Sequence, residues 1–205
     1  FPGARAHDYV FEKPDWWVKQ VYRMADFYMK AQFGSGKPNW RDYRVGIDMT
    51  GNKVGDRQET DTISRLIYGL STAYHMTGED RFLEAAEGGV EYLREHLRNV
   101  DSGEGVTYWY HAIEIQEPNE KKILASEFGD DYQAIPAYEQ IYALVGPTQV
   151  FRITGDKRIR EGIDQKISLF ERVFYDPRYG ADWCPRAPGQ FAGRGAEAGR
   201  NGGRK

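Results

Sequence analysis

Hydrophobic positions recur at helical spacing along most of the chain. In the segment 14–33, apolar side chains fall three or four positions apart; the segment opens with Pro14-Asp15 and is followed by Gly34. Proline in the first turn and glycine just beyond the last turn are typical helix boundaries. The spacing therefore predicts one helix with an apolar face. That face comprises Trp17, Val21, Met24, Tyr28 and Ala31.

The same spacing predicts two more helices joined by a tight turn. One begins at Thr60, which can cap it, and runs to Met76, and the other continues through Leu93. The sequence TGED at 77–80 separates them and has the glycine expected at a helix end. The buried stripe of the first of these helices comprises Ile63, Leu66, Ile67, Leu70 and Tyr74.

This helix–turn–helix pattern returns 77 residues later in the chain. The sequence YHMTGEDRF at 74–82 aligns with FRITGDKRI at 151–159, so each copy is a long helix, a Thr-Gly-acidic turn and a second helix. Repeated helical hairpins cannot bury their faces alone and must stack on neighbours, in a solenoid or a closed toroid. Five such helices form an open half-ring. We therefore expect that the chain is part of a longer protein, or that a second copy or another partner chain covers the open helical face.

One segment between the two copies departs from helical spacing. The region 99–133 contains the sequence GVTYWYHAIEI, whose alternation predicts a short β-hairpin or an extended loop. Inserts of this kind on the rim of a helical ring are natural places for a binding cleft. The expected fold class is therefore all-α, built of repeated helical hairpins, with a small β-hairpin insert.

Composition and charge exclude several classes of protein. The formal charge is −3 and the isoelectric point is near 5.9, which excludes a generally basic nucleic-acid-binding surface. No apolar run is long enough to span a membrane, and a single cysteine excludes an internal disulfide framework and a cysteine-based zinc site. The histidines lack metal-ligand spacing, and no phosphate loop or nucleotide-binding sequence occurs, so neither a metal nor a cofactor is expected. The low cysteine count and the absence of a leader favour the cytoplasm.

The last 25 residues differ from the rest. The segment 181–205 contains no Leu, Ile, Val or Met, has six glycines and carries a local charge of +3, which leaves −6 on the segment 1–180. We therefore divide the chain into a helical domain at 1–180 and a Gly/Arg-rich tail at 181–205. An Arg/Gly-rich nucleic-acid-binding tail is one interpretation. A disordered or non-native terminus is the favoured one, because no aromatic-Arg repeat is present.

Three stretches carry a resemblance to a known family. These are SRLIYGLSTAYHMTGEDRFLEAAEGGVEYL, AYEQIYALVGPTQVFRITGDKRI and ERVFYDPRYG, and together they resemble the N-acylglucosamine 2-epimerase family, including its cellobiose and mannose epimerase/isomerase branches. The resemblance covers roughly residues 14–180. It implies an (α/α)6 barrel with the active site at one mouth. Because such a barrel needs about twice this chain length, the resemblance also implies an incomplete, half barrel.

The resemblance implies a reaction and a first candidate residue. In this family two histidines move a proton at carbon 2 of an aldose or ketose through an enediolate, and they lie in a C-terminal half that this chain lacks. Arg65 stands where the family places its sugar-binding, enediolate-stabilising arginine, off the centre of the buried stripe. The alternative is an exterior arginine paired with Asp61, which stands where the family often has tryptophan.

Aromatic and polar residues supply the remaining candidates. His111 follows the aromatic run YWY, so we interpret Tyr110 as part of a sugar-contacting rim and His111 as a second catalytic candidate. The alternative is a hairpin that packs on its own aromatic rings. Tyr138, Gln140 and Tyr142 match a family stretch that approaches the central cavity, and Tyr138 and Gln140 are taken from it as candidates. Trp40, in an expected polar loop at 37–58, is a candidate for stacking on a sugar ring. The full set of substrate-binding candidates is Trp40, Tyr68, Tyr110, Tyr138 and Gln140.

Three functions therefore remain open. The first is a sugar 2-epimerase or aldose–ketose isomerase that acts on a small carbohydrate. The second is an α/α-toroid glycoside hydrolase or polysaccharide lyase, since Thr-Gly-acidic turns also occur there; Asp130, Asp131 or Glu139 would then act as acid and base. These carboxylates have a structural alternative as charges that complement a helix N-terminus. The third is a non-catalytic helical-repeat module that binds a sugar or a protein.

Overall fold

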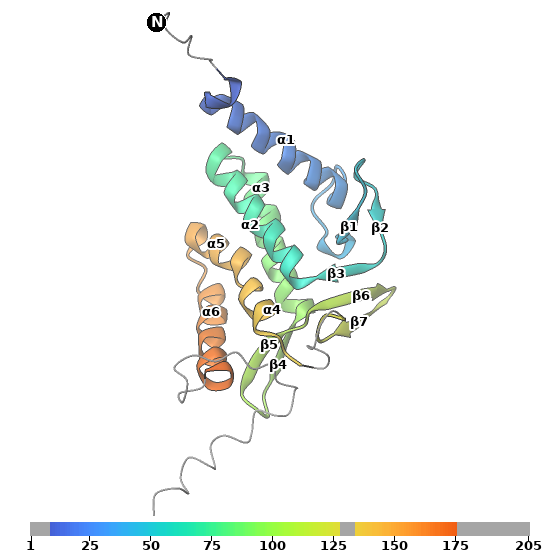
Figure 1. Cartoon of the computed structure of the whole chain (residues 1–205), viewed down its shortest axis with the longest axis vertical. Coiled ribbons are helices and arrows are strands. Elements are labelled where there is room, and N and C mark those ends of the chain that lie inside the picture. The colour runs from blue at the N-terminus through green and yellow to red at the C-terminus, as the bar shows by residue number, and fades with distance from the viewer. Residues whose placement is uncertain (1–8, 128–133, 176–205) are drawn as a thin grey trace, which may run out of the picture.

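The computed structural model describes residues 9–127 and 134–175, and in this part of the chain helices form the body while short strands lie along one side of them (Figure 1). The α-helices are α1 (Pro14–Phe33), α2 (Thr60–Thr77), α3 (Asp80–Tyr92), α4 (Ala137–Tyr142), α5 (Val145–Thr154) and α6 (Lys157–Leu169). Short 3-10 turns are η1 (Val10–Glu12) and η2 (Trp40–Asp42), and π-helical turns η3 (Leu93–Leu97) and η4 (Phe170–Phe174) extend α3 and α6. The mostly helical fold class is thus confirmed.

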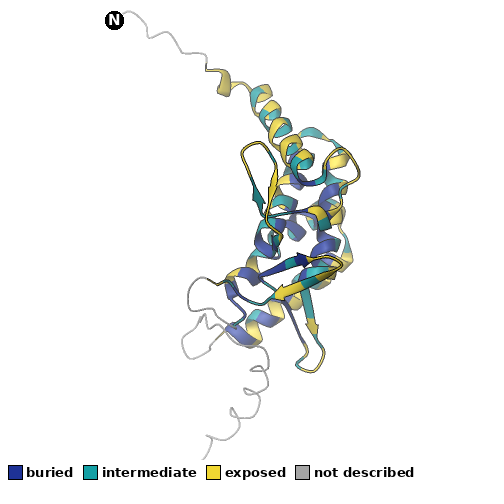
Figure 2. Cartoon of the chain, turned by 90° about the vertical axis from the view of Figure 1, so that its right-hand side faces the viewer, coloured by how far each residue is buried: buried dark blue, intermediate teal, exposed yellow. Residues whose placement is uncertain are grey.

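Helix α2 is the centre of the arrangement. It packs against α1, α3 and α5, so it has helical neighbours on three sides. Figure 2 shows that burial is concentrated around this middle region, whereas α1 is coloured mainly as exposed or intermediate. The completely or almost completely buried apolar side chains of α2 and α3 are Ile63, Ile67, Leu70, Ala73, Phe82, Ala85, Ala86 and Val90.

Helix α1 has its predicted bounds, and Val21 of its predicted apolar face packs against the core. Two other members of that face are exposed, Trp17 by 54% and Met24 by 63%, and most core-facing side chains of α1 lie on a neighbouring face. The reason is that α1 carries apolar residues on two faces, and one of them borders an open pocket beside α2. The residues of α1 on the core side are Val21, Tyr22, Ala25, Met29 and Phe33.

The repeated turn is confirmed in atomic detail. Gly78 and Gly155 end α2 and α5 in the left-handed conformation, with φ of 72° and 68°, and each N–H donates to the carbonyl four residues earlier. In both turns the threonine hydroxyl before the glycine accepts a hydrogen bond of 3.2 Å from the N–H two residues further on. Glycine suits this conformation because it has no Cβ to clash.

The second copy differs in the helix that enters the turn. A continuous long helix was predicted there, but it is interrupted between Tyr142 and Val145, which separates α4 from α5. Pro147 explains the interruption, because a proline has no N–H for a helical bond to Ala143 and its ring crowds that carbonyl. Gly146 then packs directly on α2, and its N–H donates to the Ser64 hydroxyl at 2.8 Å.

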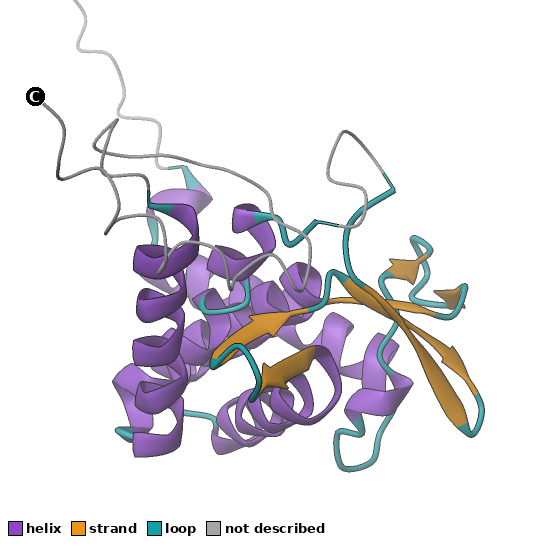
Figure 3. Ribbon diagram, turned by 90° about the horizontal axis from the view of Figure 1, so that it is seen from below, coloured by secondary structure: helices purple, strands orange, loops and turns teal. Residues whose placement is uncertain are grey.

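The β-structure is more extensive than the single hairpin that was predicted. The strands are β1 (Gly46–Ile47), β2 (Lys53–Val54), β3 (Arg57–Glu59), β4 (Arg98–Asp101), β5 (Val106–Trp109), β6 (Ala112–Gln116) and β7 (Asn119–Ile123). They form antiparallel sheets in the orders β1-β2, β3-β6-β7 and β4-β5, and Figure 3 shows the strands beside the helices. The run GVTYWYHAIEI is not a hairpin, because β5 pairs backwards with β4 and β6 pairs forwards with β7. Tyr110 and His111 form the corner between them.

Three further predictions from the sequence concern the carboxylates and tail, a membrane span and a metal site. Asp130, Asp131 and the tail at 181–205 lie outside the described residues. Within the described ranges, no helix is both long enough and apolar enough to cross a membrane. In the same ranges, no group of three or more His, Cys, Asp or Glu side chains is arranged to hold a metal ion.

Candidate functional site

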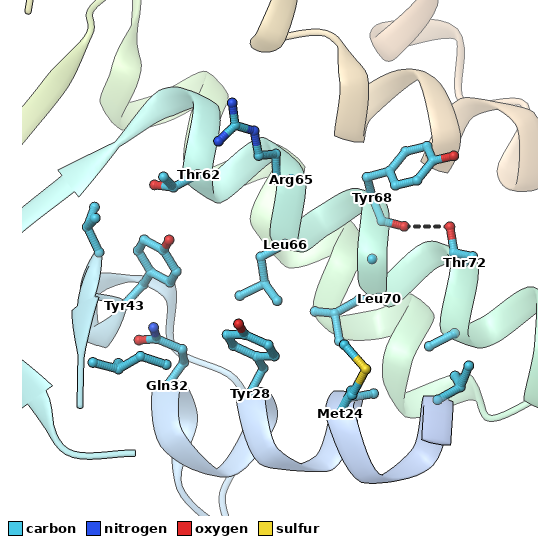
Figure 4. A pocket seen from close by; sticks show the side chains of 16 residues that line it. Met24, Tyr28, Gln32, Tyr43, Thr62, Arg65, Leu66, Tyr68, Leu70 and Thr72 are labelled. Atoms are coloured by element: carbon cyan, nitrogen blue, oxygen red, sulfur yellow. Dashed lines mark hydrogen bonds between the residues drawn. The ribbon is translucent and has the colours of Figure 1, made fainter. Parts of the chain in front are cut away.

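A pocket of about 510 Å³ lies between α1 and α2. Met24, Tyr28 and Gln32 line it from α1, and Leu66 faces them from α2 (Figure 4). Its walls are mainly apolar, and Gln32 is engaged with the backbone of the following loop rather than free to bind a ligand. Arg65 lies at the border of this pocket, and its guanidinium is directed away from α1. The pocket therefore combines an apolar floor with one cationic group at its edge.

Three groups hold the Arg65 guanidinium. Its Nη1 atom lies 3.2 Å from Asp61 Oδ2, one helical turn earlier, and its Nη2 atom donates to the Tyr138 hydroxyl at 2.7 Å. The guanidinium carbon also lies 4.5 Å from the centre of the Tyr142 ring, a cation–π distance. The Arg65 side chain is nevertheless 48% exposed. It is therefore oriented by fixed partners and still accessible to a ligand.

The structure bears on the alternative interpretation of Arg65, an exterior arginine paired with Asp61. The ion pair with Asp61 exists, as the alternative interpretation expected. Asp61, however, is 8% exposed and is not a surface partner, and its Oδ1 atom has no hydrogen-bond donor among the described residues. A carboxylate held in this way depends on the arginine beside it for compensation of its charge. The pair is thus part of a partly buried polar cluster and not an isolated exterior contact.

His111 lies in a neighbouring buried group. Its Nδ1 atom is 2.7 Å from Glu139 Oε1 and its Nε2 atom is 3.9 Å from Glu59 Oε1. His111 is 8% exposed and lines neither of the two pockets described here. Its ring is therefore not positioned to touch a substrate in this arrangement. The backbone around His111 is hydrogen-bonded to the start of α2. Thr60 donates its N–H to the His111 carbonyl and its hydroxyl to the Tyr110 backbone carbonyl.

The carboxylates around His111 raise its pKa. Burial, the largest single influence, lowers the pKa of the imidazole, but the hydrogen bond and charge of Glu139 and the charge of Glu59 outweigh it, so the pKa lies above 6.5. Burial also raises the pKa of Glu59, and the charge of Asp61 adds to this effect. Glu59 and Asp61 therefore connect the His111 group electrostatically with the Arg65 group.

Gln140 has a structural role that differs from the predicted one. It is completely buried, its Oε1 accepts from the Trp109 N–H at 2.9 Å, and its Nε2 donates to the Trp109 carbonyl at 3.0 Å. The Oε1 atom also accepts from Lys166 Nζ at 2.8 Å. Because both ends of the amide are occupied by protein groups, Gln140 fastens α4 to β5 and does not face a ligand.

The interpretation of Trp40 as a stacking surface needs correction. Trp40 is 3% exposed, and its indole N–H donates to the Ala85 carbonyl at 2.9 Å. Its ring packs against Phe33 and Tyr43 and approaches Gly89 closely. The segment 37–58 is polar in sequence, but it folds over α3 and buries its tryptophan.

The remaining candidates lie at exposed or half-buried positions. Tyr138 is 47% exposed and Tyr68 is 44% exposed. Tyr68 borders the first pocket and also a second one of about 570 Å³ between α5 and α6. Tyr110 is half-buried against Tyr108, and its hydroxyl donates to the Asn99 side chain at 3.3 Å. Tyr138 and Tyr68 are thus accessible on the Arg65 side, whereas Tyr110 contacts the neighbouring strand.

Two contacts of the site were not identified from the sequence. Tyr142 belongs to the same family stretch as Tyr138 but was not taken as a candidate, although it follows Tyr138 by four residues and therefore shares its helix face. That spacing was a usable signal once Tyr138 was a candidate. Lys166 was not singled out either, because a lysine in a charged helix gives no sign that it is buried.

Comparison with solved structures identifies the fold. The chain superimposes on cellobiose 2-epimerase from Bacillus thermoamylovorans with a TM-score of 0.65 and 19% identity, over 82% of this chain and 41% of that one. For cellobiose 2-epimerase from Spirochaeta thermophila the TM-score is 0.61 at 17% identity, over 80% and 42%. For a D-mannose isomerase it is 0.61 at 14% identity, over 89% and 41%. The fold is that of sugar epimerases and isomerases.

This likeness is one of structure and not of sequence. No protein-family model matches the chain, and no curated protein matches it in sequence. The chain spans about two fifths of the length of the structures that it resembles. The resemblance noted in the sequence is therefore confirmed at the level of fold, over part of the epimerase structure.

Proposed function

We propose that this chain supplies the arginine-bearing part of a carbohydrate epimerase or isomerase that acts at carbon 2 of an aldose or ketose. Proton removal next to a carbonyl creates a negatively charged enediolate, which needs a fixed positive group close to its oxygen atoms. Arg65 is the group that fits this role. It is accessible, and Asp61, Tyr138 and Tyr142 hold it in one orientation.

The orientation of Arg65 is the observation that carries the proposal. Its Nη1 and Nη2 atoms face Asp61 and Tyr138, while the side chain remains 48% exposed. A guanidinium has five N–H donors in a planar fork, so two partners leave donors for a sugar oxygen. Because the partners are already in place, little side-chain entropy is lost when a sugar binds.

The proton-transfer groups are proposed to come from outside this chain's described residues. His111 is buried and paired with Glu139, so it supports the site from behind and does not exchange a proton with the sugar. The chain spans about two fifths of the epimerase structures. We therefore also propose a half barrel whose open apolar grooves beside α1 and α6 are covered by further helices or by a second copy.

Isotope exchange tests this function on the completed barrel, that is, the full chain together with the helices or the second copy that cover its open grooves. The protein is incubated in deuterated water with mannose, glucose, N-acetylmannosamine and cellobiose, and the sugars are analysed by NMR and mass spectrometry. Deuterium at carbon 2 is the expected result, because proton transfer at that atom exchanges its hydrogen with solvent. New reducing ends would instead indicate a glycoside hydrolase. Binding without either change would indicate a non-catalytic sugar-binding module.

A further inference from the structure

Lys166 is an unusual residue of α6. It is 1% exposed, and its Nζ atom donates to the Thr107 carbonyl at 3.0 Å and to Gln140 Oε1 at 2.8 Å. Across 9–127 and 134–175, no carboxylate lies within 4 Å of it. Burial lowers its pKa well below the ordinary 10.5. Burying a charged lysine is costly unless hydrogen bonds or a paired charge compensate for it, so its two directed hydrogen bonds call for an explanation.

Both hydrogen bonds of Lys166 lead to β5, one directly and the other through Gln140. Thr107 and Trp109 belong to β5, which pairs with β4 along one edge. Gln140 binds both the N–H and the carbonyl of Trp109, and Lys166 binds Gln140 and the carbonyl of Thr107. Lys166 and Gln140 therefore act as side-chain partners for the edge of β5 that faces away from β4.

Helix α4 depends on this connection. It has six residues, far too few for a helix to be stable by itself, so tertiary contacts must hold it. Gln140 is its buried anchor. Tyr138 and Tyr142 lie one turn apart on the face toward Arg65, whereas Glu139 reaches His111. A movement of Gln140 would therefore move the two tyrosines that orient the guanidinium.

We propose that Lys166 is a positioning residue for the Arg65 site. It fixes Gln140, Gln140 fixes α4 against β5, and α4 places Tyr138 and Tyr142 around the Arg65 guanidinium. An apolar side chain of the same length would fill the space but would leave the Thr107 carbonyl without its donor. The importance of this positioning for a sugar rests on the proposed function of Arg65, but the positioning itself does not.

The test compares Lys166→Met with Lys157→Met, a change at an exposed lysine of the same helix. Side-chain NMR follows the Nε–H signals of Arg65 and Arg81 in the full chain without sugar. Arg81 is a matched reference, because it is 46% exposed, pairs with Asp26 at 2.7 Å and stacks on a phenylalanine ring at 4.4 Å. Amide hydrogen exchange reports on Trp109.

In Lys166→Met we expect the Arg65 signal to move toward that of an unconstrained arginine, and the Trp109 amide to exchange about tenfold faster. The Arg81 signal stays in place, and Lys157→Met changes neither signal. Unchanged Arg65 and Trp109 signals in a folded Lys166→Met protein would overturn the proposal, as would an equal shift of Arg81. If Lys166→Met does not fold, Lys166→Gln, which keeps one donor, is measured with the same criteria. Since no sugar is present, failure of the sugar assay and failure of this proposal remain distinguishable.

Discussion

The hairpin α2–α3 and the hairpin α5–α6 share their turn but differ in the helix that leads into it. Helix α2 runs without interruption for 18 residues to Gly78, whereas the corresponding segment of the second copy is divided into α4 and α5 before Gly155. The turn itself is almost identical, with φ of 72° and 68° at the two glycines. The two copies therefore have the same turn conformation but differ in the helix that precedes the turn.

This difference separates two roles. The continuous helix α2 provides Arg65 on a rigid element that packs against three neighbours. The interrupted copy provides the short helix α4, whose Tyr138 and Tyr142 contact that arginine and whose Glu139 and Gln140 hold the corner of β5 and β6. A departure from regular repetition thus builds the surroundings of the candidate site.

The largest effect is expected where the second copy meets the first. In Gly146→Ala the new Cβ would lie 2.4 Å from the Ser64 carbonyl oxygen and 2.7 Å from the Cβ of Ile67, so α5 must move away from α2. We expect a loss of about 3 kcal/mol in the free energy of unfolding. Urea denaturation of the full chain followed by circular dichroism measures it.

Gly162→Ala in α6 is the matched control. Its Cβ would meet no atom within 4 Å, so we expect a gain of roughly 0.5–1 kcal/mol from the higher helix propensity of alanine. Similar effects of the two substitutions would contradict the close contact of α5 with α2.

The two turns are expected to respond alike. Gly78→Ala and Gly155→Ala each place a Cβ in open space but in the left-handed conformation, which costs about 1 kcal/mol for an alanine. The same denaturation measurement should give equal losses for both variants. A loss confined to one of them would show that the turns are not energetically equivalent copies.

The smallest effect concerns pH. The pKa of His111 is raised above 6.5, so its contribution to stability is complete below pH 6.5 and is lost as the pH rises through the pKa of the folded state. The free energy of unfolding should therefore fall by roughly 1 kcal/mol or less between about pH 6 and about pH 8. In His111→Asn this fall should shrink, whereas His75→Asn, at an exposed histidine of α2, should keep it. An undiminished fall in His111→Asn would assign the pH dependence to other groups.

Most of the fold was predictable because helical spacing and turn chemistry are local. The bounds of α1 and the Thr-Gly turns follow from Pro14, Gly34, Gly78 and Gly155 alone. The buried face of α1 did not follow, because apolar side chains occupy two of its faces and only the neighbouring helices decide between them. The pairing of the strands was likewise beyond a local pattern, since β6 joins β3 across more than fifty residues.

The candidate site was predictable only in part. Arg65 and Tyr138 were identified from the sequence and lie in contact. Trp40 was misinterpreted because the polarity of its loop concealed a buried ring, and Gln140 because a polar side chain looks the same whether it binds a ligand or a strand. Lys166 gave no signal, since burial of a charged residue is a property of packing.

The central proposal is that Arg65 stabilises the enediolate oxygen when a proton leaves carbon 2 of a sugar. In the completed barrel, deuterium incorporation at that carbon is compared for the unchanged chain, for Arg65→Ala and for Arg81→Ala. The two arginines have nearly equal exposure, and both pair with a carboxylate and stack on a ring. We predict that Arg65→Ala lowers the exchange rate about a hundredfold or more, as loss of a charge-stabilising donor does, while Arg81→Ala leaves it unchanged. Exchange retained in Arg65→Ala, or lost equally in both variants, would contradict the claim.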